Sequence, residues 1–217
     1  MPFLPITKEE TEALGWDRPD FVLVTGDAYV DHPTFGPAII SRLLESRGWR
    51  VAILAQPEWR EGKDFARFGR PRLAFLVSAG NIDSMVAHYT AARRKRSDDA
   101  YSPGNRAGLR PDRASIVYTK KIKELYPDCP VVLGGLEASL RRFAHYDYWA
   151  DEIRPSILVE SGADLLTFGM GERQSLEIAE RLAAGEPVAA LRDIRGTCCL
   201  IPAEEYEPGP AVDCPSY

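Results

Sequence analysis

The chain has 217 residues, of which 45% are hydrophobic, and this composition excludes a disordered or fibrous protein. Its 27 basic and 32 acidic side chains leave a formal net charge of −5, which disfavours binding of nucleic acid over the whole surface. No apolar run approaches the ~18 residues of a membrane helix, and the first residues lack the layout of a signal peptide. We therefore expect a cytoplasmic protein with no membrane partner.

The first expected element is a short helix, because Thr7 and Glu10 have the spacing of a capping box and Gly15 can end it in a left-handed conformation. A second helix is expected to start at Asp31-His32-Pro33, where the missing proline N–H costs little, and to end at Gly48. The apolar periodicity predicts later helices over residues 116–126 and 176–184.

Between these helices lie short apolar runs without alternation, which are typical of strands buried on both faces of a sheet. The predicted strands lie near residues 21–25, 51–54, 73–77, 131–133, 165–168 and 197–201. Buried strands that alternate with amphipathic helices form βαβ units and a parallel sheet. The sequence therefore predicts an α/β fold that is doubly wound and mainly parallel, with five or six strands in the flavodoxin-like order 2-1-3-4-5.

Two stretches interrupt this alternation. Residues 93–114 form a long Gly/Pro/Arg-rich excursion, and loops of this length are usually functional or disordered. Because a charged loop of this kind buries little apolar area, we expect it to be mobile in the absence of a partner. The chain from Pro202 onward is rich in proline and acids, without periodicity. We predict an α/β domain over residues 1–201, followed by a linker over 202–217.

Polar residues and glycines follow four of the predicted parallel strands. Open α/β sheets bind ligands beyond the carboxyl ends of their strands, where the strand order reverses. Glycine lets a backbone approach a ligand there, and acids and amides supply hydrogen bonds. Taken singly, each such residue is also a common turn or cap residue. We expect one concave binding patch with the candidate residues Asp27, Asp31, His32, Asn81, Asp83, Gly134, Gly135, Glu137 and Glu172.

The cysteines and histidines give no clear metal site. Cys129, Cys198, Cys199 and Cys214 are few and irregularly spaced, so we expect reduced thiols rather than a disulfide scaffold. The three histidines have no ligand partner at i+3 or i+4, and no metal site is predicted, although a triad of these histidines is the alternative.

Two segments suggest contacts with partners. Residues 93–113 carry a basic run that could hold phosphates, with Tyr89 and Tyr101 able to stack on bases, but a solvated charge run is favoured over nucleic-acid binding. Docking of this run on another part of the same protein stays open. The aromatic tract over residues 140–149 indicates an interface or a substrate wall, and core packing is the alternative.

Several long strings resemble the N-terminal region of the YgiQ-type radical SAM proteins. In chain order they are GDAYVDHPTFG (26–36), AGNIDSMVAHYTA (79–91), RKRSDDAYSPG (94–104), RPDRA (110–114), VLGGLEASLRRFAHYDYW (132–149), GMGE (169–172) and IRGT (194–197). The resemblance covers nearly the whole chain, from Phe3 to Thr197. It implies the cobalamin-binding-like α/β domain that precedes many radical SAM barrels.

The resemblance also implies that the full-length protein binds a [4Fe–4S] cluster and S-adenosylmethionine through a CxxxCxxC motif. No cysteines of this chain have that spacing, so we expect no cofactor in this segment and no activity from it alone. Its expected role is an accessory domain on the substrate side of a radical SAM enzyme of unknown substrate, with the C-terminal barrel as its partner.

Two alternatives remain at this point. The first is a non-catalytic interaction module that docks a protein or RNA partner. The second is a cobalamin-binding domain, because Gly134-Gly135 matches the usual glycine pair of such domains. The D-x-H-x-x-G motif of cobalt-ligating domains is not matched, since Asp31 and His32 are adjacent here.

Overall fold

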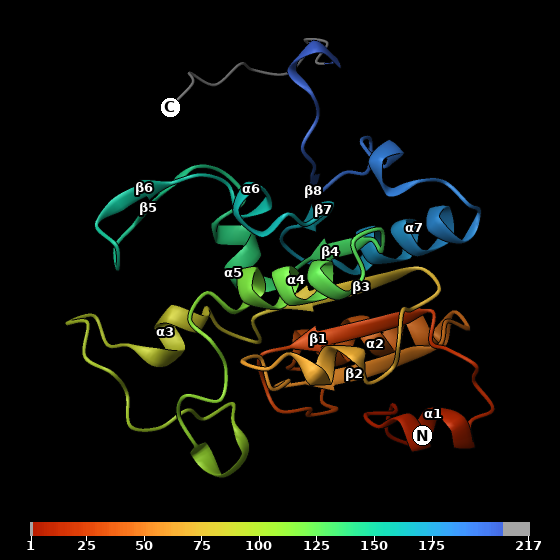
Figure 1. The fold of residues 1–217 in the computed structure, drawn as a ribbon, viewed down its shortest axis with the longest axis horizontal. Coiled ribbons are helices and arrows are strands. Elements are labelled where there is room, and N and C mark those ends of the chain that lie inside the picture. Colours follow the sequence, from red (N-terminus) through yellow and green to blue (C-terminus); the bar gives the residue numbers. More distant parts are fainter. Residues whose placement is uncertain (1, 206–217) are drawn as a thin grey trace.

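The computed structural model describes residues 2–205, and within them a six-stranded sheet runs in the order β2-β1-β3-β4-β7-β8 (Figure 1). Strands β1, β2, β3, β4 and β7 pair in parallel, and β8 pairs antiparallel with β7. This arrangement confirms the predicted α/β fold, the strand order 2-1-3-4-5 and the reversal between β1 and β3. The strands are β1 (Phe21–Thr25), β2 (Val51–Ala55), β3 (Ala74–Ser78), β4 (Val131–Leu133), β7 (Leu165–Thr167) and β8 (Thr197–Cys198).

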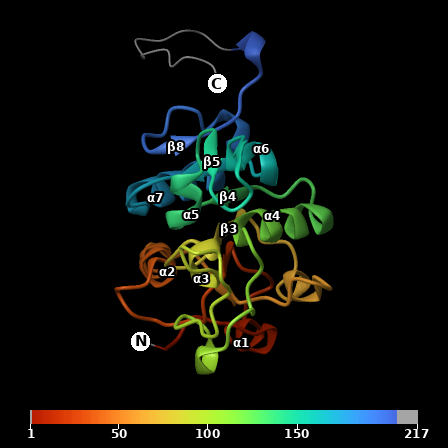
Figure 2. The same cartoon turned by 90° about the vertical axis from the view of Figure 1, so that its left-hand side faces the viewer.

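The helices cover both faces of the sheet, as a doubly wound fold requires. Figure 2 shows α2 (Gly36–Ser46) and α7 (Glu172–Ala183) on one side and α4 (Ala114–Leu125) and α6 (Ile157–Ser161) on the other. Each side has its own buried apolar cluster: Leu44 and Ile178 belong to the first, and Tyr118 and Ile157 to the second. The β1–α2 and β3–α4 connections therefore diverge to opposite faces, which leaves the edge open where the strand order reverses.

The shorter elements lie around this framework. Helix α1 (Lys8–Ala13) precedes β1, while α3 (Ser84–His88) and α5 (Gly135–Leu140) follow β3 and β4 at the carboxyl edge. Strands β5 (His145–Asp147) and β6 (Glu152–Arg154) form a separate antiparallel hairpin that was not predicted. The short 3-10 helices are η1 (Lys63–Ala66), η2 (Pro103–Asn105), η3 (Val188–Ala190) and η4 (Ala203–Glu205).

The predicted start of α1 is confirmed, whereas the predicted start of α2 is wrong. Both hydrogen bonds of the capping box between Thr7 and Glu10 are present, so that prediction is confirmed. Helix α2 begins at Gly36 and not at Asp31, because Phe35 is extended and Pro37 occupies the first helical turn. Residues 31–35 form a loop instead. Strand β8 is also shorter than the predicted 197–201 and ends at Cys198.

The excursion over residues 93–114 makes specific polar contacts with the rest of the domain. Isolated bridges pair Tyr89 with Lys95 and Asp98 with Arg106, so the segment folds into two successive turns. The side chains of Asp99 and Arg110 are buried beneath it. Most of the segment is exposed, in line with the expected small burial of apolar area, and the buried polar side chains anchor it. Its mobility in the absence of a partner stays a prediction.

The remaining predictions concern the ends of the chain and membranes. Of the predicted linker over 202–217, only residues 202–205 belong to the part that the structure describes. Within residues 2–205, no helix combines the length and the apolar character that crossing a bilayer requires.

Candidate functional site

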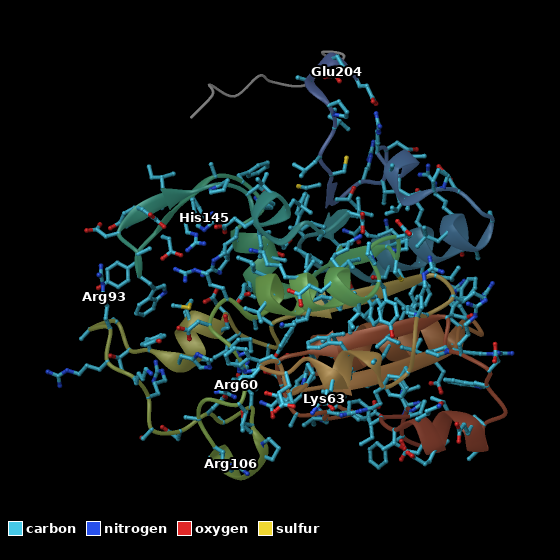
Figure 3. The ribbon with its side chains drawn as sticks, viewed as in Figure 1. Arg60, Lys63, Arg93, Arg106, His145 and Glu204 are labelled. Carbon is cyan, nitrogen blue, oxygen red and sulfur yellow. The ribbon has the colours of Figure 1, made fainter. Side chains whose placement is uncertain are left out.

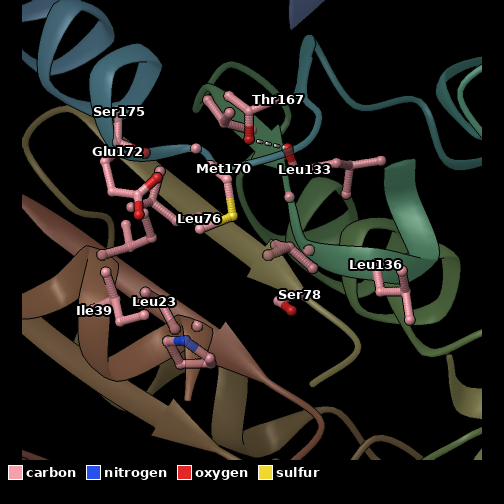
Figure 4. A pocket seen from close by; sticks show the side chains of 18 of the residues that line it. Leu23, Ile39, Leu76, Ser78, Leu133, Leu136, Thr167, Met170, Glu172 and Ser175 are labelled. Carbon is pink, nitrogen blue, oxygen red and sulfur yellow. Dashed lines mark hydrogen bonds between the residues drawn. The ribbon is translucent and has the colours of Figure 1, made fainter. Parts of the chain in front are cut away.

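A crevice opens at the carboxyl edge of the sheet, between the ends of β3, β4 and β7 and the first turns of α2 and α7 (Figure 4). Its volume is about 210 Å³, and its walls are mostly apolar, with side chains such as Ile39, Leu76 and Leu133. Its glycines are Gly36, Gly80, Gly134, Gly135, Gly169 and Gly171. Such a surface exposes backbone groups beside apolar side chains, which suits a flat or apolar ligand with few polar groups.

The glycine pair that ends β4 shapes the floor of the crevice. Gly135 has a φ of 81°, and a Cβ atom at this position would lie 2.6 Å from Ser78 Oγ. A side chain there would both strain the backbone and collide with the end of β3. The pair Gly134-Gly135 thus lets α5 start directly from β4 while the crevice stays open.

Four of the nine predicted site residues line this crevice: Asn81, Gly134, Gly135 and Glu172. Asn81 also joins two loops of the edge. Its Oδ1 accepts a hydrogen bond from the Gly36 N–H at 3.3 Å, and its Nδ2 donates to the Thr34 carbonyl at 3.4 Å. Asn81 therefore connects the loop after β3 to the start of α2.

Asp27 lies beneath the crevice rather than in its wall. Its buried carboxylate accepts a hydrogen bond from the Asn81 N–H at 2.7 Å and lies 2.9 Å from Arg110 Nη1. The same guanidinium donates to Asp99 at 2.8 Å and to the Ala79 carbonyl at 3.0 Å. Burial raises the pKa of the Asp27 carboxyl. This ionic layer holds the excursion against β1 and β3.

Asp83 and Glu137 are also buried and satisfied by the fold. Asp83 caps α3 through the Met85 N–H at 2.9 Å and pairs with Arg141. Glu137 accepts hydrogen bonds from the N–H groups of Ser84 at 2.8 Å and Ser115 at 2.9 Å. Its carboxylate therefore holds the starts of α3 and α4 together, and neither acid lines the crevice.

Asp31 and His32 occupy the loop before α2, away from the crevice lining. Hydrogen bonds from Arg42 hold the Asp31 carboxylate and lower its pKa. The Nδ1 atom of His32 lies 2.9 Å from Thr34 Oγ1, and the ring is exposed. The structure thus brings four of the nine candidates to one crevice and leaves five outside it.

The thiols and histidines do not gather in the described part of the chain. Residues 2–205 contain no group of three His, Cys, Asp or Glu side chains that could hold a metal ion. Cys129, Cys198 and Cys199 are free, and Cys214 lies outside the described residues. Burial raises the pKa of the Cys129 thiol.

Sequence reasoning missed the apolar rim of the crevice. Leu136 and Met170 line it and are exposed, Met170 by 79%, and Leu140 on the same α5 helix is exposed by 61%. Met170 stands between the two glycines of the GMGE string, of which only Glu172 was among the candidate site residues. A large apolar side chain between two glycines is the signal that could have revealed this rim.

The aromatic tract over residues 140–149 lies mostly on the surface, so core packing is the wrong interpretation for its exposed members Phe143, Tyr146 and Tyr148. Trp149 packs against Tyr89 with ring centroids 5.2 Å apart. The tract therefore borders α3 and the excursion on the left of Figure 1.

Comparison with known proteins shows to which family this chain belongs. Residues 3–217 match the model of the Radical SAM N-terminal family, and the chain belongs to that family. The chain is 59% identical over 208 residues to the UPF0313 protein YgiQ of Escherichia coli (strain K12), covering 96% of this chain and 28% of that relative. It is 57% identical over 217 residues to a UPF0313 protein of Geobacter sulfurreducens, covering 100% of this chain and 36% of that relative. The chain thus spans about a third or less of these relatives.

Two solved structures share the fold. Both are of TsrM from Kitasatospora setae, a radical S-adenosylmethionine methyltransferase. The one with tryptophan and a SAM analog bound has a TM-score of 0.52 at 20% identity and covers 82% of this chain and 27% of that one. The structure with cobalamin and a [4Fe–4S] cluster bound has a TM-score of 0.51 at 20% identity, and the match covers 84% of this chain and 29% of that one. At this identity the likeness establishes the fold alone.

Proposed function

We propose that this chain is the N-terminal accessory domain of a radical SAM enzyme and that its crevice holds part of the substrate where the domain meets the catalytic barrel. The crevice with its exposed apolar rim is the observation that carries this proposal. Clustered apolar side chains such as Leu136, Leu140 and Met170 are typical of a surface that another domain or a ligand covers. The greater length of the relatives is consistent with such a covering domain.

The cluster chemistry is assigned to the rest of the protein. A radical SAM cluster needs three thiolates at CxxxCxxC spacing, and the sequence of this chain has no such spacing. In this proposal the present residues bind and orient the substrate and exclude water, while the [4Fe–4S] cluster and S-adenosylmethionine are held by the barrel.

A cobalamin held through a histidine does not fit the crevice. The described residues that line it include no histidine. His32, the candidate nearest in sequence to the ligating motif, lies outside the lining, and its Nδ1 faces Thr34. We therefore assign no role to cobalt in this proposal.

The first test measures the exposure of Met170 in the intact protein. Met85 is buried and serves as the internal control. If the barrel or substrate covers the rim, Met170 is oxidised by dilute peroxide about as slowly as Met85, as measured by peptide mass spectrometry. Rapid oxidation of Met170 contradicts docking at the rim and favours the alternative of a non-catalytic interaction module.

The second test compares matched surface variants of the intact protein with its cluster reconstituted. Leu136→Asp with Met170→Asp places two charges on the rim, whereas the control variant, Val159→Asp with Leu125→Asp, places two on α6 and α4, where these residues are 56% and 46% exposed. We expect the rim variant to lower S-adenosylmethionine cleavage at least tenfold and the control variant to leave it unchanged. Equal cleavage by both variants overturns the proposal.

A further inference from the structure

A second and larger cavity lies on the α4 side of the molecule. Its volume is about 580 Å³, and its walls come from the loop after β2, the end of α3, the excursion and α4. It shares no lining residue with the crevice. Small-molecule sites have volumes of roughly 300–1,000 Å³, so this cavity has room for a ligand of metabolite size.

Three basic side chains give this cavity an excess of positive charge. Arg60, Lys95 and Arg96 line it, and within residues 2–205 none of them forms an ion pair with an acid. The one acid in the lining, Asp112, is engaged by the ring of His88 at 2.6 Å and by the Tyr89 hydroxyl at 2.8 Å. Nearby cations without counterions attract anionic ligands.

Two residues of the lining each carry a buried polar atom that has no hydrogen-bond partner among the described residues. These atoms are Trp59 Nε1, which can only donate, and His88 Nε2. The His88 side chain is only 10% exposed, and its Nδ1 lies 2.6 Å from the Asp112 carboxylate, so Nε2 is the ring nitrogen that has no partner. Buried polar groups are nearly always paired in native proteins, so the Trp59 N–H indicates a ligand that accepts hydrogen bonds.

The basic residues are fixed beside these atoms by the backbone. Tyr89 and Lys95 form an antiparallel bridge, and the Arg96 N–H donates to the His88 carbonyl at 2.8 Å. The Arg60 guanidinium stacks over the Trp59 ring at 4.4 Å. The Arg96 side chain donates from Nε to the Val86 carbonyl at 3.1 Å, which leaves its other guanidinium nitrogens for a ligand. The basic run thus forms one wall of a cavity, and Figure 3 shows Arg60 close to the excursion.

We propose that this cavity binds a small phosphate monoester. Arg60, Lys95 and Arg96 hold the phosphate oxygens, and Trp59 Nε1–H donates to the same group. A dianion matches the excess of positive charge better than a single carboxylate does. A nucleic-acid strand is disfavoured, because its binding requires charges along an extended groove, whereas these three cations surround a single cavity. The site is independent of the crevice and of its proposed role.

Titration calorimetry on the intact protein tests this inference with phenyl phosphate as the probe. Phenol serves as its neutral counterpart, benzoate as its carboxylate counterpart, and a single-stranded RNA oligonucleotide as the polyanion. We expect phenyl phosphate to bind at least tenfold more tightly than phenol or benzoate. The proposal is overturned if phenyl phosphate does not bind or if benzoate binds equally well. It is also overturned if the RNA binds more tightly and its binding depends on Lys95 and Arg96 in the same way.

Matched variants locate the site. Lys95→Gln with Arg96→Gln removes two charges from the cavity wall, and Arg94→Gln with Arg106→Gln removes two from exposed positions of the same excursion outside the lining. We expect the first pair to weaken phenyl phosphate binding at least tenfold and the second pair to weaken it less than twofold. Equal losses from both pairs would mean that only the general charge of the segment matters, and they contradict a built site.

A third variant keeps the charge and the aromatic ring but removes one donor. Trp59→Phe deletes the unpartnered Nε1–H, so we expect phenyl phosphate binding to weaken three- to tenfold. The melting temperature of each variant without ligand shows whether the fold is kept. A folded Trp59→Phe protein that binds phenyl phosphate with unchanged affinity contradicts the assigned donor.

Discussion

The crevice and the basic cavity are both built from loops at the carboxyl edge, yet they lie toward opposite faces of the sheet and differ in chemistry. The crevice is lined by glycines and apolar side chains, with Glu172 as its one charged lining residue among those described. The cavity is lined by cations without acidic partners and by Trp59, whose indole N–H has no hydrogen-bond partner. Because successive connections of a doubly wound sheet pass to opposite faces, one edge can support two sites of different character.

A buried ionic layer separates the two regions. Asp27 receives a hydrogen bond from Asn81, which lines the crevice, and pairs with Arg110, which lines the cavity. Arg110 also binds Asp99 in the excursion. Asp27 and Arg110 are charged residues of the kind expected in a binding site, but here they form the buried layer between the crevice and the cavity. The following substitutions test whether such residues are structural or contact a ligand.

The largest expected effect comes from removing the cation of this layer. Arg110→Met leaves Asp27 and Asp99 buried without their partner, so the free energy of unfolding is expected to fall by about 3–5 kcal/mol. Urea denaturation followed by circular dichroism measures it. Arg106→Met at an exposed position of the same segment is the control, with an expected change within about 0.5 kcal/mol. Similar losses from both variants would show that the layer does not hold the excursion.

The next effect separates two acids that the sequence presents as equivalent. Glu137→Leu removes the acceptor of the Ser84 and Ser115 N–H groups and is expected to cost about 3 kcal/mol, because these donors lose their partner. Glu172→Gln at the crevice is expected to change stability by less than about 0.5 kcal/mol. Thermal unfolding of both variants gives the comparison. If the Glu137→Leu protein is as stable as the unchanged protein, Glu137 does not hold α3 and α4 together.

A smaller effect is expected in the crevice floor. Gly135→Ala adds backbone strain at positive φ and a contact of 2.6 Å with Ser78, so we expect a loss of about 2 kcal/mol. Gly169→Ala also has a positive φ but meets nothing within 4 Å, and a loss of about 1 kcal/mol is expected. The difference between the two melting temperatures measures the close approach itself. No difference would mean that Ser78 moves aside freely.

The smallest effect concerns Asp31, outside both regions. Its pKa is lowered in the folded protein by Arg42, so its contribution to stability is present above the unfolded value near ~4 and is lost as the pH falls through the folded pKa. Asp31→Asn is expected to reduce stability at neutral pH by less than about 1 kcal/mol and to flatten the acid limb of the stability curve. Denaturation midpoints between pH 2 and 7 test this, and an unchanged acid limb contradicts it.

Local sequence patterns determined the framework of this protein. Continuous apolar runs such as 21–25 and 51–54 can only be buried on both faces, and the glycines after β4 mark a backbone that must turn closely. These features depend on neighbours in sequence, so the strands of the six-stranded sheet and four crevice residues were predictable, whereas the β5–β6 hairpin was not. The capping box at Thr7 was predictable for the same reason.

Only the tertiary structure decided which polar groups remain available for ligands. Asp27 and Asn81 both follow parallel strands, but a distant Arg110 takes the Asp27 carboxylate and leaves the amide side chain at the crevice. Through Arg110 the same contact attaches the excursion to the end of β1. Partners that lie 83 residues apart, as Asp27 and Arg110 do, are brought together by the fold and leave no local pattern in the sequence. Burial then makes their pairing obligatory, because an unpaired buried charge is too costly to keep.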